Sequence, residues 1–206
     1  MSTMPVTVKR SALKLPAGSV RAIHVLGIVA LVCAIILMPG HQTIPPYLIY
    51  LLFMMVGHYF AAHGVTIATR EDSSPSPLYL PGGTVRVLII LILAGCVGWK
   101  LYDDRDGFQA QFAASLDALK TQPYLPLAIL GGFFVGVALH SLVSRKDPPA
   151  AWQDFEAWVS LIALIGLAIA AIIHLVIDPS TEVKVMIPTF DACLGAVVAF
   201  YFGERS

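Results

Sequence analysis

The sequence predicts an all-α polytopic membrane protein with six transmembrane helices. Its 206 residues are 57% hydrophobic and only 13% charged, whereas soluble domains carry roughly 25% charged residues. Mean hydropathy is +0.79, and the apolar residues are gathered in six long runs. Backbone groups in hydrocarbon have no water to bind, so such runs must satisfy their own hydrogen bonds as helices. The composition therefore argues against a soluble globular domain.

The chain divides into a polar cytoplasmic tail, residues 1–19, and a single six-helix transmembrane domain, residues 20–206. Each apolar run comes close to or exceeds the ~20 residues that cross ~30 Å of hydrocarbon. The tail and first run look like the front of a secretory signal, but no small-residue cleavage site follows, so we expect this run to remain as a span. The six runs cover residues 20–38, 45–68, 84–102, 124–143, 157–177 and 186–203.

The longest connection joins the third and fourth runs and begins with an acidic cluster. We expect a short helix over residues 108–119 in it. Its apolar side, formed by Phe112, Leu116 and Leu119, would lie on the membrane surface. The second run has Pro46 at its start, where the first turn of a helix tolerates proline.

Lysine and arginine set the expected orientation, because they gather on the cytoplasmic side of membrane proteins. Nine of the 13 lie on the side of the N-terminus and four on the other. Both termini are therefore expected in the cytoplasm of a bacterial inner membrane, which requires an even number of spans. Trp152, Phe155 and Trp158 predict an aromatic belt at the inner interface. The first group is Lys9, Arg10, Lys14, Arg21, Arg70, Arg86, Arg145, Lys146 and Arg205; the second is Lys100, Arg105, Lys120 and Lys184.

A weak internal repeat indicates three helical hairpins of similar plan. The second and fourth runs open with Pro-Tyr-Leu, at residues 46–48 and 123–125. Both carry Val-Gly near the same depth, at Gly57 and Gly136, and both end at a histidine. Self-similarity of this kind is typical of repeated supersecondary units. The alternative is chance similarity among apolar helices.

Small residues recur every four positions in five of the runs, which puts them on one face of each helix. Helices in lipid lack a hydrophobic drive to associate, so small faces hold them together by letting backbones approach. The pattern predicts tight packing, within the chain or between chains, and Gly132 with Gly136 is the first candidate for contact between chains. The faces are Gly57 with Ala61, Ala94 with Gly98, Gly132 with Gly136, Gly166 with Ala170, and Gly195 with Ala199 and Gly203.

The small faces of the last two runs each end in an ionisable side chain, His174 on one and Asp191 on the other. A charge inside a membrane is costly and needs a partner. The two residues lie at similar depths on either side of a short loop, so we predict that they form an intramembrane polar pair. A buried hydrogen bond that locks the last hairpin is one interpretation, and a proton or cation site is the other.

Four histidines, His24, His58, His63 and His140, fall in the inner half of the predicted spans, and His24, His58 and His140 are the candidates for a cofactor. Facing imidazoles can ligate a b-type haem. His140 shares a face with Gly132 and Gly136, and a small face beside a histidine suits a planar cofactor. Packing at the interface is the simpler interpretation of all three histidines, and it leaves the protein without a cofactor.

The sequence holds no hydrolase, metalloprotease, P-loop or dinucleotide-binding motif, and its net charge of zero steers no nucleic acid. We therefore expect a non-enzymatic membrane protein that acts by association, as a homo-oligomer or as a structural subunit of a larger membrane complex. Its partners would be the lipid bilayer and other subunits. One alternative is a small ion channel or proton-coupled transporter that uses Asp191 and His174; the second is a haem-bearing electron carrier.

Overall fold

The computed structural model describes most of the chain and shows only helices there. The described residues are 18–38, 42–64, 83–120, 124–143, 150–176 and 188–204, with Leu13, Leu15, Pro16, Leu78 and Leu80 beside them. The helices in these ranges are α1 (Ser19–Leu37), α2 (Pro46–Gly64), α3 (Thr84–Asp103), α4 (Arg105–Lys120), α5 (Tyr124–Val143), α6 (Ala150–Val176) and α7 (Pro188–Glu204). The all-α prediction is confirmed for this part of the chain.

Four of these helices are long and apolar enough to cross a membrane. They are Ser19–Leu37, Thr84–Asp103, Tyr124–Ser141 and Ala151–Ile173. The described parts of α2 and α7 contain shorter apolar stretches, Pro46–Phe60 and Ala192–Glu204. A membrane protein is therefore supported, whereas six complete spans are not established by helix length.

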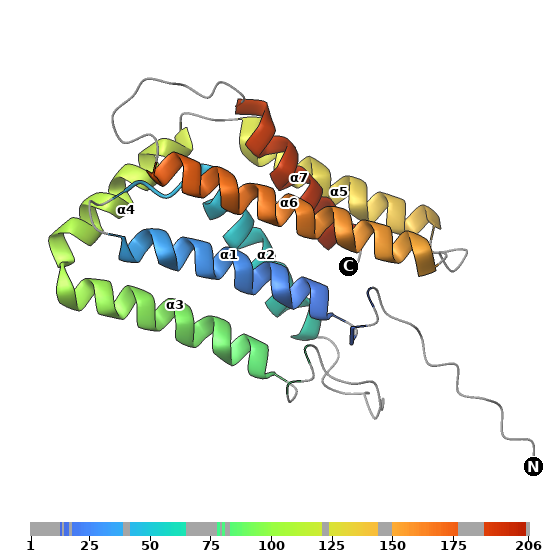
Figure 1. Ribbon diagram of the computed structural model, residues 1–206, viewed down its shortest axis with the longest axis horizontal. Helices are drawn as coiled ribbons and strands as arrows, with labels where there is room; N and C mark the ends of the chain where they lie inside the picture. The colour runs from blue at the N-terminus through green and yellow to red at the C-terminus, as the bar shows by residue number, and fades with distance from the viewer. Residues whose placement is uncertain are drawn as a thin grey trace, which may run out of the picture.

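The long helices run alternately between two ends of the bundle (Figure 1). Helices α1, α3 and α6 begin at one end, which we call the termini end, and α2, α5 and α7 run toward it. The opposite end carries α4, and we call it the α4 end. An up-and-down arrangement of this kind brings the start of α1 and the finish of α7 to the same end.

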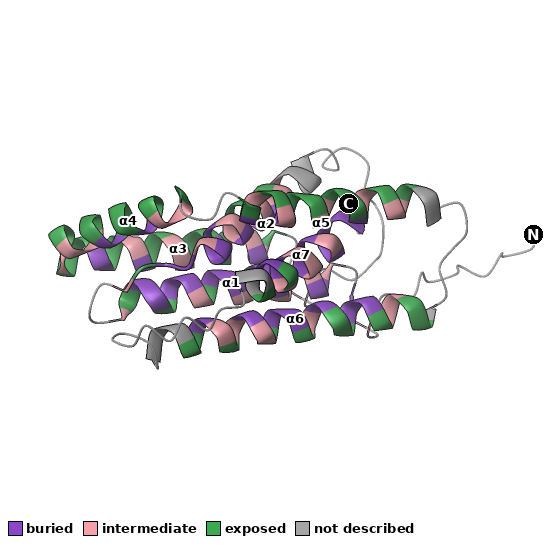
Figure 2. Ribbon diagram, turned by 90° about the horizontal axis from the view of Figure 1, so that it is seen from above, coloured by how far each residue is buried: buried purple, intermediate pink, exposed green. Residues whose placement is uncertain are grey.

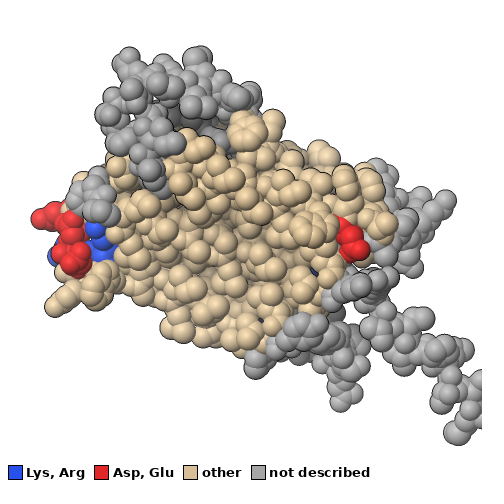
Figure 3. Space-filling model, viewed as in Figure 1, with Lys and Arg blue, Asp and Glu red and all other residues tan. Residues whose placement is uncertain are grey.

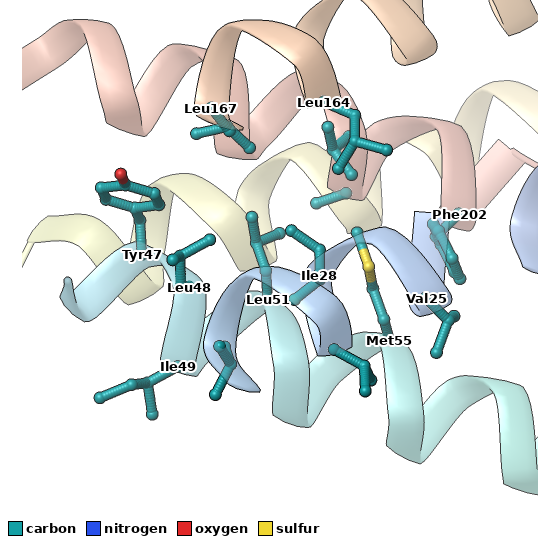
Figure 4. Packing of buried hydrophobic residues seen from close by; sticks show 14 of the residues in the cluster. Val25, Ile28, Tyr47, Leu48, Ile49, Leu51, Met55, Leu164, Leu167 and Phe202 are labelled. Atoms are coloured by element: carbon teal, nitrogen blue, oxygen red, sulfur yellow. The ribbon is translucent and has the colours of Figure 1, made fainter. Parts of the chain in front are cut away.

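Helix α1 lies at the centre of the bundle, between α3 and α6 (Figure 1). Its apolar residues extend round the whole helix, as expected of a helix that is covered on most sides, and most of them are buried (Figure 2). The core that it organises is apolar, with large side chains interlocking from four helices (Figure 4). They include Val25 and Ile28 of α1, Leu48, Leu51 and Met55 of α2, Leu164 and Leu167 of α6, and Phe202 of α7.

Helices α5 and α7 form the most extensive helix pair, and their backbones touch. A Cβ atom on Gly132 would lie 2.9 Å from the Cα of Ala196, and one on Gly136 would lie 2.7 Å from the backbone nitrogen of Glu204. A Cβ on Gly203 would meet the carbonyl oxygen of Phe133. Real Cβ contacts essentially never fall below 3.0 Å, so only glycine fits these positions. Both helices run the same way, since later residues of one meet later residues of the other.

The sequence left open whether the small-residue face of α5 packs within the chain or between chains. The face of Gly132 and Gly136 packs inside the chain, against α7, and is not free to receive another chain. Gly195 also points toward α5, where a Cβ would lie 3.4 Å from Ile129. On α6, a Cβ added to Gly166 would instead lie 3.0 Å from the Leu194 side chain. Ala199 is fully buried and Ala170 half-buried.

The structure does not show three hairpins paired in chain order. Helices α1 and α2 pack together, and so do α6 and α7. Helix α3, however, packs on α1 and α4, whereas α5 packs on α7 and α2. The physical reason is that α4 carries the chain across the α4 end between α3 and α5 (Figure 1), so these two helices need not be neighbours.

Helix α6 begins earlier than the apolar run predicts, at Ala150 rather than at residue 157, and extends over 27 residues. Trp152, Phe155 and Trp158 therefore belong to its first turns, and all three side chains are exposed. The rings of Trp152 and Phe155 lie 5.9 Å apart. Their place at a membrane interface remains a prediction.

We predict that Gly136→Ala destabilises the protein, because its Cβ would collide with the α7 backbone, which cannot rotate out of the way. Overpacking of a core costs about 1–3 kcal/mol, and a backbone collision lies at the upper end. The matched control is Gly131→Ala on the same helix, where a Cβ would meet no atom within 4 Å. Thermal unfolding in detergent measures both variants. Equal melting temperatures for the two would contradict the α5–α7 contact.

Candidate functional site

One face of helix α3 lies on the outside of the bundle and is not covered by another described helix. Its buried residues Val85, Ile89 and Cys96 face inward. The opposite side carries residues spaced three or four apart, as on a single helix face. We call this side the α3 open face; it consists of Val87, Leu91, Ala94, Gly98 and Tyr102, all of them exposed.

Gly98 distinguishes the α3 open face from the glycine faces of α5 and α7. A Cβ on Gly98 would meet no atom within 4 Å, and the same holds for its neighbour Gly95. The Ala94 and Gly98 pair therefore has the small-residue spacing noted in the sequence but has no helix packed against it. This leaves a shallow backbone surface open toward the surrounding lipid.

Buried polar side chains gather at the termini end, beginning with His24 of α1. Its side chain is fully buried, and Nδ1 donates a hydrogen bond to the Val20 carbonyl oxygen at 2.8 Å. The ring stacks on Tyr201 with centroids 5.5 Å apart and meets the Phe202 ring edge-on at 6.1 Å. The end of α7 thus packs directly on this histidine.

His58 of α2 packs against the same aromatic residue from another helix. Its ring lies 6.0 Å from Phe202 and 5.6 Å from Phe133, both edge-on. Phe202 therefore contacts both His24 and His58. The glycine face of Gly132 and Gly136, on the helix of His140, is covered by the backbone of α7. These contacts fit the interpretation of the histidines as packing residues.

Two buried carboxyl groups belong to the termini end, and the sequence analysis missed both. Glu156 lies on the first turns of α6 and Glu204 is the last residue of α7; each is 7% exposed. The signal for Glu156 was available in its spacing. It continues the buried stripe of Ser160, Ala163 and Leu167 one turn toward the helix start.

Segments outside the helices are tied to the same end. The backbone nitrogen of Leu13 donates to the Asp154 carboxylate at 2.6 Å. That of Leu78 donates to the Ser19 hydroxyl at 2.8 Å. Two helices are also joined at this end: the Arg86 guanidinium of α3 lies 5.8 Å from the centre of the Phe60 ring of α2, within the range of a cation–π contact.

Helix α4 closes the α4 end through polar contacts and through the partly buried side chains of Phe108 and Leu119. Gln111 is buried, and its Nε2 donates to the carbonyl oxygens of Gln42 at 2.7 Å and Ile35 at 3.3 Å. The Ser115 hydroxyl accepts a hydrogen bond from the Ile44 nitrogen at 3.0 Å.

The apolar residues of α4 turn outward from this polar face. Phe112 and Leu116 are exposed, while Leu119 packs partly on the core. The short helix over residues 108–119 is confirmed within Arg105–Lys120.

The predicted pair of His174 and Asp191 lies outside the side chains that the structure describes, although both residues belong to described helices. Their pairing stays a prediction. The chain has no match among the protein-family models, curated proteins and solved structures with which we compared it.

We predict that His24 stabilises the termini end by packing its ring against Tyr201 and Phe202. His24→Ala should lower the free energy of unfolding by about 2–5 kcal/mol, the range for cavities left by large core side chains. His24→Phe keeps a ring in place and should lose much less. Thermal unfolding in detergent compares the two, with half-buried His140→Ala as control. If Phe proved as harmful as Ala, the imidazole nitrogens rather than the ring would hold the site.

Proposed function

We propose that this chain is a non-enzymatic integral membrane protein that acts by association with a second copy of itself through the α3 open face. The observation that carries the proposal is the uncovered Ala94 and Gly98 pair on α3. Helices in lipid associate through small faces that let backbones approach. The comparable faces of α5 and α7 are covered inside the chain, whereas α3 offers a pair of small residues that are both exposed.

The surface of the bundle supports a place within the membrane. On the face that Figure 3 shows, a wide band without Lys, Arg, Asp or Glu lies between charged groups at the two ends. A band of this kind matches the hydrocarbon layer of a bilayer. We propose six spans, with α2 and α7 completing the bundle alongside the four long apolar helices. We also propose that both termini lie in the cytoplasm of a bacterial inner membrane, on the strength of the Lys and Arg distribution.

The distribution of buried polar groups favours association over ion transport. In the described part of the chain, these groups gather at the two ends, as with Glu156 at one and Gln111 at the other. The middle of the core is apolar, including Ile28, Leu51 and Leu167 (Figure 4). A transport pathway needs polar groups along its length. The alternative built on His174 and Asp191 would have to find its pathway outside this core.

We predict that Gly98→Leu reduces self-association, because a large side chain would hold two copies of α3 apart. A Cβ at this position would meet no atom within 4 Å, so we expect the fold to be kept. Native mass in lipid nanodiscs or mild detergent should fall from an oligomer to a monomer.

The matched control for this experiment is Gly131→Leu on α5, which is equally open in the structure. It should keep both the fold and the oligomeric mass of the unchanged protein. An unchanged mass for Gly98→Leu, or a monomeric mass for the unchanged protein, would remove the α3 open face as the site of self-association.

We predict that single cysteines report both termini on the cytoplasmic side. In a background with the three natural cysteines replaced by serine, Ser73→Cys and Lys146→Cys should resist membrane-impermeant maleimide added to intact cells. Gln109→Cys, on the exposed side of α4, should be labelled. Labelling of Ser73→Cys from outside would show that the predicted orientation or the predicted number of spans is wrong.

A further inference from the structure

A groove lies between α1 and α3, on the side of the bundle next to the α3 open face. Its volume is about 440 Å³, which falls within the range of ligand-sized pockets. Its walls are almost entirely apolar, and two of the three cysteines of the chain stand in them. The lining residues are Cys33, Leu37, Ile92, Gly95, Cys96 and Trp99.

The two cysteines face each other across the helix pair. Cys96 Sγ donates to the carbonyl oxygen of Cys33 at 3.6 Å. Cys33 Sγ points back toward α3 and lies 4.0 Å from the carbonyl oxygen of Ile92, one turn before Cys96. Each thiol therefore points at the backbone of the other helix, Cys96 at Cys33 itself and Cys33 at the residue one turn before Cys96. Both are free thiols with little exposed surface.

Because Cys33 belongs to α1 and Cys96 to α3, a disulfide between them would link these two helices covalently. A disulfide forms when two cysteines are adjacent and an oxidant accepts two electrons. The polarity of the groove determines which kind of oxidant can reach the thiols. Its walls are apolar and it opens beside the exposed side of α3, so oxidised glutathione, a water-soluble disulfide, is a poor fit and a lipid-soluble oxidant is a good one.

We propose that Cys33 and Cys96 form a redox-active thiol pair that a membrane quinone oxidises to a disulfide linking α1 to α3. A quinone ring is flat, apolar and soluble in the bilayer. Gly95 presents bare backbone to the groove, since a Cβ there would meet no atom within 4 Å, and this allows a flat ring to lie close to the helix. The indole of Trp99, which is 62% exposed, supplies an aromatic wall.

The reaction balances without any further reagent. The two S–H bonds break and one S–S bond forms, so the dithiol gives up two protons and two electrons. The quinone ring accepts the two electrons, its two carbonyl oxygens take up the two protons, and the product is a quinol. Each reduced chain therefore yields one quinol. The proposal is independent of self-association, because the groove and the α3 open face lie on different sides of α3.

Thiol counting after exposure to quinone tests the proposal. The protein in nanodiscs is first reduced, freed of reductant and mixed with a short-chain benzoquinone. It is then unfolded and alkylated. We expect the number of alkylated thiols to fall from three to one, with Cys193 the remaining thiol, and one quinol to appear per chain. Peptide mapping should identify the Cys33–Cys96 disulfide.

Variants separate this pair from other thiol chemistry. Cys33→Ser and Cys96→Ser should each keep two alkylated thiols and produce no quinol, whereas Cys193→Ser should still form the disulfide. Diamide, a small thiol oxidant, serves as a comparison. If diamide forms the disulfide and the quinone does not, quinone is the wrong oxidant and the proposal fails. If neither forms it, the two cysteines are not a pair and the proposal also fails.

Discussion

The backbone contact between α5 and α7 is the constraint on which the rest of the structure depends. Apolar side chains gain little by leaving lipid for a helix interface, so helices in a membrane rely on close van der Waals packing. Gly132, Gly136 and Gly203 remove the side chains that would otherwise separate the two axes. Because α7 is held against α5, its other sides pack against α6 and α2. The last helix therefore joins the helices on both its sides into one bundle.

This placement of α7 also builds the termini end. The finish of α7 brings Tyr201 and Phe202 onto His24, and Phe202 onto His58. The two imidazole rings are thus packed among aromatic side chains contributed by other helices. Glu204 is carried to a buried position by the same helix. The termini end is thus polar in composition but packed like a core.

Glycines serve opposite purposes on different helices of the same protein. On α5 and α7, Gly132, Gly136 and Gly203 are covered and allow contact within the chain. On α3, Gly95 and Gly98 are open, one beside the groove with its two thiols and the other on the α3 open face. Helix α3 is held mainly by α1 and α4, so it is the element most available for chemistry or contacts at the edge of the bundle.

The sequence by itself determined the class of protein, the helical content and the places where most helices run. Apolar runs and sparse charge leave helices as the stable structure in lipid, and the proline at residue 46 marks the start of α2. The start of α6 was misjudged because Glu156 and its polar neighbours interrupt the apolar run, although Glu156 and Ser160 continue the buried stripe. Mean hydropathy is an average over all sides of a helix, so it does not reveal a single buried face.

Only the tertiary structure decided which faces meet. Stripes of small residues look alike on α3, α5, α6 and α7, and four-residue spacing says that they share a face but not what lies opposite. The structure pairs the stripe of α7 with α5 and leaves that of α3 open. It also brings Cys33 beside Cys96, 63 positions away in the chain. Such contacts depend on how helices are ordered round α1, and that order is set by packing between distant segments rather than by any local pattern.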